Sequence, residues 1–303
     1  MTGLIAVDWG TSSFRLWLMR PDGTAIAEAR GPEGMAHCLE AGFAPVLSRY
    51  LEQVSAPPDW PVLICGMAGA RQGWAEAPYA DLPAPVGAIA AAALRLPPEQ
   101  AGKRDIRILP GLARRNPHRP DVMRGEETQL LGLALAGYNG LVCMPGTHCK
   151  WAVLEGGAVT DFKSFMTGEL YHLLTQHSIL RLSLPARDQH APDDPDFLEG
   201  VDQALDDPGC LVEALFPIRA GALLGFGQGE TSRARLSGLV IGSEIARMLP
   251  QIGAGDLTLL GQQGLGALYL SAMRRAKLDP QLADAELATR RGLLAAARKI
   301  WSL

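Results

Sequence analysis

The first residues that could do chemistry follow an apolar run close to the start of the chain. In VDWGTSSFRLW, residues 7–17, Asp8 precedes a turn of Gly10, Thr11 and Ser12, and a second apolar run comes next. Glycine lets backbone N–H groups approach a phosphate closely, and neighbouring hydroxyls add donors. A carboxylate at a strand end can hold Mg²⁺, usually through water. The stretch therefore predicts a metal and phosphate site, whereas the structural alternative is that Asp8 caps a tight turn.

The Gly-Thr pair returns as Gly146 and Thr147, 136 positions after the first copy. In both copies an apolar strand precedes the pair, and a strand with a tryptophan, a turn and a third strand follow it. Met144 stands where the first copy has Asp8, so only one copy carries the acid. The pattern predicts a duplicated three-strand hairpin with two phosphate-binding turns and one metal site. Such a duplication is typical of actin-like ATPases and sugar kinases.

Two acids open a predicted helix in RGEETQLLGLAL, residues 124–135. The helix dipole favours carboxylates in a first turn, so Glu126 and Glu127 have a purely structural explanation. Their place just before the second hairpin suggests another role, because a carboxylate there could accept the proton of an attacking hydroxyl. Phosphoryl transfer needs such a base, phosphate donors, Mg²⁺ and the exclusion of water. We expect Glu126 to be the base, with Glu127 as the second choice.

Cations and one aromatic residue near these motifs suggest where an anionic acceptor would bind. Arg15 and Lys150 follow the two turns and could contact a phosphate or a carboxylate, although either could lie on the solvent face of its hairpin. The glycine-rich loop GMAGARQGW, residues 66–74, offers Arg71 for an anion and Trp74 as a pocket wall. An ordinary exposed loop explains the same residues equally well.

The remaining motifs exclude several other chemistries. Gly261, in LTLLGQQGLG, begins a turn that could lie against adenine, but its glycine spacing is not the dinucleotide fingerprint. His148 and Cys149 are adjacent and poorly placed to share a metal, and His172 and His177 are off the helical spacing of a zinc motif. Neither a GxSxG elbow nor a Walker lysine motif is present.

Strand clusters followed by helices occur twice, which predicts two α/β lobes. Residues 1–137 would hold the first hairpin and the acceptor pocket, and residues 138–303 the second hairpin and the adenosine site. Strands are predicted at 4–9, 13–19, 24–30, 61–66, 104–109, 141–144, 150–155, 158–165 and 256–261. Helices are predicted at 43–55, 87–95, 127–137 and 283–300. The arginine- and proline-rich residues 111–122 predict a linker or an exposed loop.

Composition bounds the location and the partners. The 303 residues are 48% hydrophobic and 20% charged, and a net charge of −4 argues against nucleic acid or an anionic membrane as the main partner. Five scattered cysteines without a CxxC pair favour a reduced, cytoplasmic setting. No run reaches the roughly 18 apolar residues of a membrane span. Apolar residues in the last helix leave a homodimer open, but packing on its own lobe is favoured.

Five segments together resemble the 2-dehydro-3-deoxygalactonokinase family. They are VDWGTSSFRLW, GMAGARQGW, MRGEETQLLGL, PGTHCKWAVLEGG with FMTGELYHLL, and LLGQQGLGALY. The resemblance runs along nearly the whole chain, and PGTHCKW and RGEETQ are its most specific parts. It implies a two-lobe actin-like, ribonuclease H-like ATPase fold that closes over ATP, with FMTGELYHLL as a lid. It also implies ATP- and Mg²⁺-dependent phosphorylation of the sugar acid 2-dehydro-3-deoxy-D-galactonate at its terminal hydroxyl, in galactonate catabolism.

One departure from related kinases keeps alternatives open. Related carbohydrate kinases carry Gly-Asp where this chain has Gly125 and Glu126, so the carboxylate is one methylene longer. Exopolyphosphatase-like relatives carry a Gly-Glu-Glu stretch there, so a phosphohydrolase of the same fold is the alternative. A catalytically silent sensor is a third, which the presence of both acids disfavours. The sequence does not assign a preference between the galactonate- and gluconate-derived acceptors.

Overall fold

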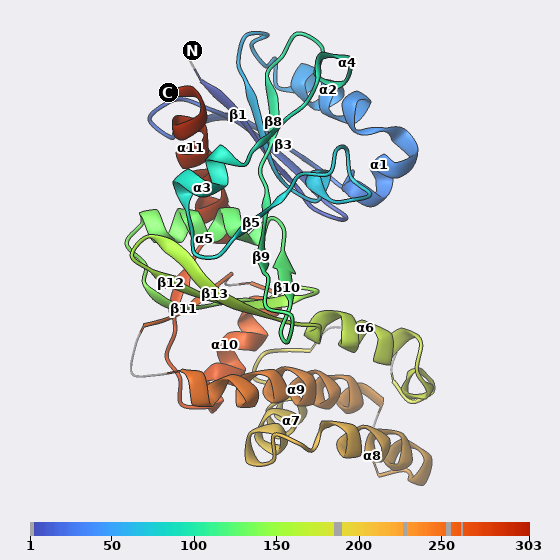
Figure 1. Cartoon of the computed structure of the whole chain (residues 1–303). Helices are drawn as coiled ribbons and strands as arrows, with labels where there is room; N and C mark the ends of the chain where they lie inside the picture. Colours follow the sequence, from blue (N-terminus) through green and yellow to red (C-terminus); the bar gives the residue numbers. More distant parts are fainter. Residues whose placement is uncertain (1–2, 185–189, 227–228, 253–255, 262) are drawn as a thin grey trace. The chain divides into compact units, whose positions relative to one another are not determined.

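The computed structural model describes residues 3–184, 190–226, 229–252, 256–261 and 263–303, and only the backbone at 229–232 (Figure 1). The chain has the mixed α/β composition expected from the sequence and forms two compact units. Unit 1 comprises Met1–Asn139, Ala152–Phe162 and Ala285–Leu303, and unit 2 comprises Gly140–Trp151 and Lys163–Asp284. This division differs from the expected one at residues 137 and 138, because the last helix and the segment 152–162 cluster with unit 1.

A six-stranded sheet forms the centre of unit 1. Its strands have the order β3-β2-β1-β4-β8-β7. They are β1 (Leu4–Trp9), β2 (Phe14–Met19), β3 (Ala25–Gly31), β4 (Val62–Gly66), β7 (Leu94–Arg95) and β8 (Ile106–Ile108). β1 pairs antiparallel with β2 and parallel with β4. A strand covered on both faces has a continuous apolar sequence, and Asp8 is the one residue of β1 that is not fully buried.

Six α-helices and a small sheet complete unit 1. The helices are α1 (Met35–Ala41), α2 (Phe43–Gln53), α3 (Val86–Ala91), α4 (Pro98–Ala101), α5 (Glu126–Leu135) and α11 (Ala285–Trp301), with the 3₁₀ turn η1 (Met67–Gly69). The small sheet has the order β10-β9-β5, from β5 (Tyr79–Asp81), β9 (Gly111–Arg114) and β10 (Asp121–Met123). The expected helix at 87–95 is shorter than predicted and is followed by β7.

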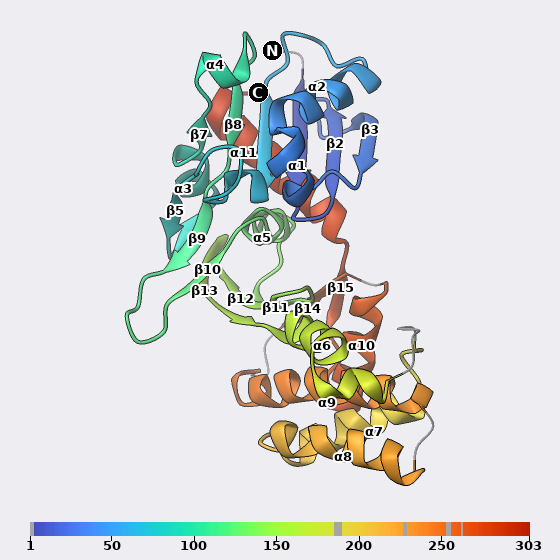
Figure 2. The ribbon, with the colours of Figure 1, turned by 90° about the vertical axis from the view of Figure 1, so that its right-hand side faces the viewer.

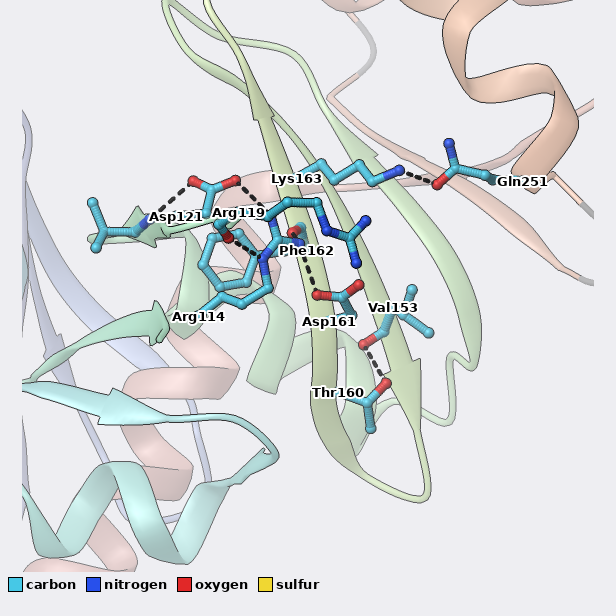
Figure 3. A network of polar contacts seen from close by, with 10 residues as sticks. Arg114, Arg119, Asp121, Val153, Thr160, Asp161, Phe162, Lys163 and Gln251 are labelled. Carbon is cyan, nitrogen blue, oxygen red and sulfur yellow. Dashed lines mark hydrogen bonds and ion pairs between the residues drawn. The ribbon is translucent and has the colours of Figure 1, made fainter. Parts of the chain in front are cut away.

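The expectation of a linker or exposed loop at 111–122 holds for residues 115–120, which are exposed and outside any strand. It is wrong for the flanking residues, because β9 and β10 pair there as an antiparallel hairpin. Arg114 explains why this arginine-rich piece is ordered (Figure 3). Its guanidinium lies 2.9 Å from Asp161 Oδ1 and 3.6 Å from Asp121 Oδ2, and it also donates to the carbonyl of Phe162. The side chain is only 14% exposed. Sequence composition does not reveal this, because two of the acceptors, Asp161 and the Phe162 carbonyl, come from distant β13.

The packing of α5 on α11 explains why the end of the chain belongs to unit 1. A Cβ atom at Gly132 would lie 1.9 Å from the carbonyl oxygen of Ala288, and one at Gly292 would lie 1.9 Å from that of Thr128. Only glycine lets the two backbones come this close. The two glycines lie 160 positions apart, and the contact is invisible to local sequence patterns.

The remaining sheet has the order β15-β14-β11-β12-β13-β6. Its strands are β6 (Ala84–Pro85), β11 (Gly140–Met144), β12 (Cys149–Glu155), β13 (Ala158–Phe165), β14 (Leu257–Leu260) and β15 (Gln281–Ala283). β11 pairs parallel with β14, as β1 does with β4. The order β13-β12-β11-β14 thus matches β3-β2-β1-β4 of the first sheet, and the duplication of the hairpin unit stays a prediction.

The helices of unit 2 pack on one another around α9 (Figure 2). They are α6 (Thr167–Gln176), α7 (Pro195–Asp206), α8 (Leu211–Leu224), α9 (Gly229–Met248) and α10 (Leu265–Arg275), with the 3₁₀ turns η2 (Ile179–Leu182) and η3 (Leu249–Gln251). Trp151, Phe197 and Tyr269 are fully buried in the core of this unit. In the described ranges, no helix has the length and apolarity to span a bilayer.

Candidate active site

Asp8 sits near the end of β1 with a partly exposed carboxylate. Its strand neighbours in the pairing register are Arg15 on β2 and Cys65 on β4. The carboxylate lies 4.0 Å from Arg15 Nη1 and 3.9 Å from Cys65 Sγ, and 21% of the side chain is exposed. Burial raises the pKa of Asp8, the positive charge of Arg15 opposes the rise, and the negative charge of Glu126 adds to it. One long ion pair leaves the carboxylate poorly compensated, which fits an additional cation such as Mg²⁺.

The two acids that open α5 have different environments. Glu126 is half-buried, and its Oε2 accepts a hydrogen bond of 3.0 Å from the backbone N–H of Arg124. Glu127 is fully buried and accepts bonds from the Gly125 N–H at 2.6 Å and the Thr128 hydroxyl at 2.9 Å. Burial, followed by the charge of Glu126, raises the pKa of Glu127 to about 8. Glu126 is therefore the acid that a solvent-borne substrate can reach.

Cys65 connects Asp8 with the start of α5. Its thiol is fully buried, and burial together with the charges of Asp8 and Glu127 raises its pKa well above the usual value. The thiol lies 3.9 Å from Asp8 Oδ1, and the charge of Glu127 also acts on its pKa. Sequence analysis did not select Cys65, because a cysteine in an apolar strand is typical of a core.

The turn of Gly10, Thr11 and Ser12 leaves its hydroxyls open. Thr11 and Ser12 are exposed, and the Gly10 N–H donates to the Ser13 carbonyl at 2.9 Å. The start of α1 holds the turn from behind, because the Met35 N–H donates 2.9 Å to the Gly10 carbonyl. The turn is thus fixed by its carbonyls, while its hydroxyls remain available to a ligand.

The glycine-rich loop begins beside the two carboxylates. A Cβ atom at Gly125 would lie 3.3 Å from the Cα of Gly66, where β4 ends, so the loop and the start of α5 approach closely. Arg71 is exposed on this loop and makes no hydrogen bond or ion pair within the described part of the chain. The indole of Trp74 stacks on Phe43 at 6.0 Å and meets Trp9 edge-on at 6.0 Å. It also lines a hollow of about 450 Å³ beside α2, and its role as a wall of the acceptor pocket stays a prediction. Its half-buried ring is thus largely a part of the core.

The second turn belongs to unit 2 and is held in a similar way. Thr147 is exposed, and its carbonyl accepts a bond of 3.0 Å from the Glu169 N–H at the start of α6. A Cβ atom at Gly168 would lie 2.6 Å from the Gly146 carbonyl oxygen, so α6 begins directly against the turn. Residues expected to form a lid are therefore the first part of a helix that supports Gly146 and Thr147. His148 also contacts Glu169 through its imidazole.

The sequence left open whether Lys150 lies on the solvent face of its hairpin, and the structure shows that it does not. The side chain is buried, and its ammonium donates 3.0 Å to the carbonyl of His148 within the same turn. Arg15, by contrast, is 35% exposed and contacts Asp8. Of the three expected cations, the structure brings Arg15 to Asp8 in unit 1 and places Lys150 at the second turn in unit 2.

A buried carboxylate below the second turn was missed by the sequence analysis. Glu244 on α9 accepts bonds of 2.7 Å from both Trp151 Nε1 and the Tyr269 hydroxyl, and a third from the hydroxyl of Thr167. It lies within 4.8 Å of the buried thiols of Cys143 and Cys149, the one group of three possible metal ligands in the described ranges. Because neutral donors already bind both of its oxygens, we interpret Glu244 as a structural centre. An acid inside the apolar stretch GLVIGSEIARM was the available signal.

Gly261 directly follows β14 in unit 2 and has a backbone conformation that favours glycine. Its φ is +104°, and nothing lies within 4 Å of the place a Cβ would take. A cavity of about 120 Å³ lies at the start of α10, lined among others by Leu265, Leu268 and Tyr269. The lining is mostly apolar, but the volume is below the range of about 300–1,000 Å³ that is usual for small-molecule pockets.

Known proteins resemble this chain along its full length. A family model described as 2-keto-3-deoxy-galactonokinase matches residues 8–296. A probable 2-dehydro-3-deoxygalactonokinase of Rhizobium meliloti (strain 1021) is 48% identical over 98% of this chain and 97% of its own length. The 2-dehydro-3-deoxygalactonokinase of Escherichia coli (strain K12) is 34% identical, with 98% of each chain covered.

Solved structures agree with the sequence comparisons. The crystal structure of a candidate 2-dehydro-3-deoxygalactonokinase from Sinorhizobium meliloti has a TM-score of 0.93 at 48% identity, covering 99% of this chain and all of the other. Component A of (R)-2-hydroxyglutaryl-CoA dehydratase from Acidaminococcus fermentans shares the fold alone, with a TM-score of 0.52 at 14% identity and 98% and 96% coverage. The predicted actin-like α/β fold class is confirmed. The chain belongs to the 2-keto-3-deoxy-galactonokinase family.

Proposed function

We propose that this chain transfers the γ-phosphoryl group of ATP to the 6-hydroxyl of 2-dehydro-3-deoxy-D-galactonate. The products are 2-dehydro-3-deoxy-6-phosphogalactonate and ADP. Family membership and two relatives that carry this kinase name support the activity. The structural observation that carries the proposal is the half-buried carboxylate of Glu126 at the start of α5, whose charge raises the pKa of Asp8, while Glu127 is fully buried.

Glu126 is the proposed base. Its carboxylate accepts the proton of the 6-hydroxyl while that oxygen forms a bond to the γ-phosphorus and the bond to the β-phosphate oxygen breaks. The Arg124 N–H, 3.0 Å from Oε2, holds the carboxylate in place before the acceptor binds. Glu127 is the weaker choice, because its carboxyl group is sealed from solvent and engaged with Gly125 and Thr128.

Phosphate binding is assigned to the two turns. The exposed hydroxyls of Thr11 and Ser12 would bind phosphate oxygens in unit 1, and Gly146 and Thr147 would do so in unit 2. Gly10 would act by shaping the turn, because its N–H already donates to the Ser13 carbonyl. Asp8 would hold Mg²⁺, which when bound neutralises charge on the phosphates. Arg15 beside Asp8 keeps that carboxylate oriented in the absence of the ion.

The carboxylate of the sugar acid needs a cation, and Arg71 is the best supported choice. It is exposed on the loop that begins at Gly66, and Gly66 lies next to the start of α5. An arginine can bind a carboxylate through two parallel hydrogen bonds. Lys150 is a weaker choice for this contact because it is buried at the second turn, and Trp74 could contribute only the edge of its ring.

The adenosine of ATP is assigned to unit 2. The open turn at Gly261 and the apolar cavity at the start of α10 are the features that support this. The five free, buried thiols support a reducing compartment, and we infer a cytoplasmic location from them.

Acceptor-dependent ADP release tests the proposal. The native protein is assayed with Mg·ATP and 2-dehydro-3-deoxygalactonate, its gluconate epimer, galactose or no acceptor, and ADP and free phosphate are measured separately. We expect ADP without free phosphate, and only with the keto-deoxy acids. Phosphate release that is equally fast without any acceptor would contradict the kinase and indicate a phosphohydrolase.

A further inference from the structure

A hollow in unit 1 is lined by residues that are not part of the proposed kinase site. It has a volume of about 820 Å³, within the range of small-molecule pockets of about 300–1,000 Å³. The turn at 22–24, the end of β2 and the outer face of α11 line it. β2 runs from the Gly10 turn to Met19 in this hollow, and six residues at about 3.3 Å each separate the two ends by about 20 Å.

The charge of the hollow is opposite to that of the whole chain. Arg290, Arg291, Arg298 and Lys299 line it, with Asp22 as the one acid among the lining residues, although the protein carries a net charge of −4. Asp22 already accepts a hydrogen bond of 2.8 Å from the Thr24 N–H in its own turn. The lining therefore has an excess of positive charge, which favours an anionic ligand.

The two arginines in the middle of α11 carry the argument. Arg298 and Lys299 lie in the last turn of α11, where cations are favoured by the helix dipole, and Arg298 also donates to the carbonyl of Pro21. Neither reason applies to Arg290 and Arg291. Within the described ranges no hydrogen bond or ion pair is made by either guanidinium, and Arg290 Nε is buried without an acceptor. A buried donor without a partner costs free energy that an anion would recover.

The hollow also has an apolar side. Leu135, at the end of α5, and Leu287 line it and are 56% and 37% exposed, and Met19, Val86 and Leu294 complete this side. A ligand with both a ring and charged groups would cover these side chains while its charges reach the arginines. Inorganic phosphate alone would leave them exposed.

We propose that this hollow is a binding site for an organic phosphate of about nucleotide size, separate from the kinase site. The phosphates contact Arg290 and Arg291, and the ring covers Leu135 and Leu287. Arginine suits this role because its guanidinium binds phosphate oxygens through two N–H groups at once. The site does not depend on the identity of the sugar-acid substrate.

The test compares binding by the native protein, the double variant Arg290→Gln with Arg291→Gln, and the control Arg247→Gln with Arg274→Gln. The control removes the same charge from exposed arginines of unit 2. Fructose 1,6-bisphosphate and ADP serve as probes in calorimetry, and hydrogen–deuterium exchange locates the protected amides. We expect protection at residues 19–25 and 287–299, and a dissociation constant at that site about tenfold weaker in the double variant only.

Unfolding midpoints and the KM for ATP show whether the double variant is folded, and both are expected to match those of the native protein. Equal affinity at this site in the native protein and the double variant would overturn the proposal, as would a lack of protection at both segments. Loss of binding in the control as well would show non-specific charge attraction and would also overturn it. Kinase activity is measured separately, so its failure would leave this result standing.

Discussion

Neighbouring glutamates at the start of α5 differ by one position in sequence and by their contact with solvent. Glu126 is half-buried, whereas Glu127 is fully buried against Thr128 and the Gly125 N–H. The turn of the helix puts adjacent side chains about 100° apart, so one acid faces the solvent and the other the core. This difference separates the proposed base from an acid that keeps its proton at neutral pH.

Replacing Glu127 should change how stability depends on pH. The pKa of Glu127 is raised from 4.5 to about 8 by burial, so between these values the folded protein holds a proton that the unfolded chain has lost. Native stability therefore falls as pH rises through this window, by at most about 1.4 kcal/mol per unit from this group. In Glu127→Gln this contribution is absent, and urea unfolding at pH 5 to 8 should show the variant gaining stability relative to native as pH rises.

The exposed Glu76→Gln variant is the matched control, since it should keep the native pH dependence. If Glu127→Gln and native protein show parallel stability curves from pH 5 to 8, the assignment of a raised pKa to this buried carboxyl is wrong.

At the scale of elements, the contact between α5 and α11 fixes the helix that carries the base. Gly132 and Gly292 each meet a backbone carbonyl of the other helix, and a backbone cannot move aside as a side chain can. The position of Glu126 therefore depends on a helix from the far end of the chain.

Gly292→Ala should destabilise the protein strongly, by about 3 kcal/mol or more, because its Cβ would lie 1.9 Å from the Thr128 carbonyl oxygen. The control is Gly87→Ala on α3, where nothing lies within 4 Å of a Cβ, and alanine should be neutral or stabilise by up to about 1 kcal/mol. Chemical denaturation gives both values. Equal stability of the two variants would contradict the close packing of α5 on α11.

Local sequence patterns predicted the elements whose own residues indicate whether they are buried or exposed. The run LIAVDW predicts a covered strand, and β1 matches it. The Gly-Thr turn at residues 10 and 11 predicts a hairpin, and β1 and β2 pair antiparallel around it. Arg114 on β9 also contacts Asp161 and the Phe162 carbonyl on β13, and the sequence does not show these contacts. The place of α11 depends on two glycines that lie 160 positions apart, Gly132 and Gly292.

The candidate site divides in the same way. Residue types and spacing selected Asp8, Glu126 and the two turns, because the residues that make up each of these motifs are adjacent in the sequence. The contact of Cys65 with Asp8 and the three bonds to Glu244 arise from strands and helices that are distant in sequence. Trp74 was expected to line the acceptor pocket, and its contacts with the rings of Trp9 and Phe43 could not be seen in the sequence.

At the scale of the whole molecule, ligands that bind the folded chain should raise its unfolding midpoint. A ligand at 100 times its dissociation constant stabilises by about 2.7 kcal/mol. We expect ATP with Mg²⁺ to raise the midpoint more than ATP with EDTA, and Asp8→Asn to lose most of this difference because Asp8 is the proposed Mg²⁺ ligand. Asp59→Asn, which changes an acid outside the site, is the control. An unchanged Mg²⁺ effect in Asp8→Asn would remove Asp8 from the metal site.

The most direct test of the account is the turnover number of Glu126→Gln in the acceptor-dependent ADP assay, with Glu127→Gln beside it. The amide keeps the shape of the side chain but cannot take a proton. General-base catalysis is worth about 10²–10⁴-fold, so we predict a fall of kcat in that range for Glu126→Gln with little change in KM, and a smaller fall for Glu127→Gln. Full turnover by Glu126→Gln would contradict the proposed base and, with it, the way this site is assigned to perform phosphoryl transfer.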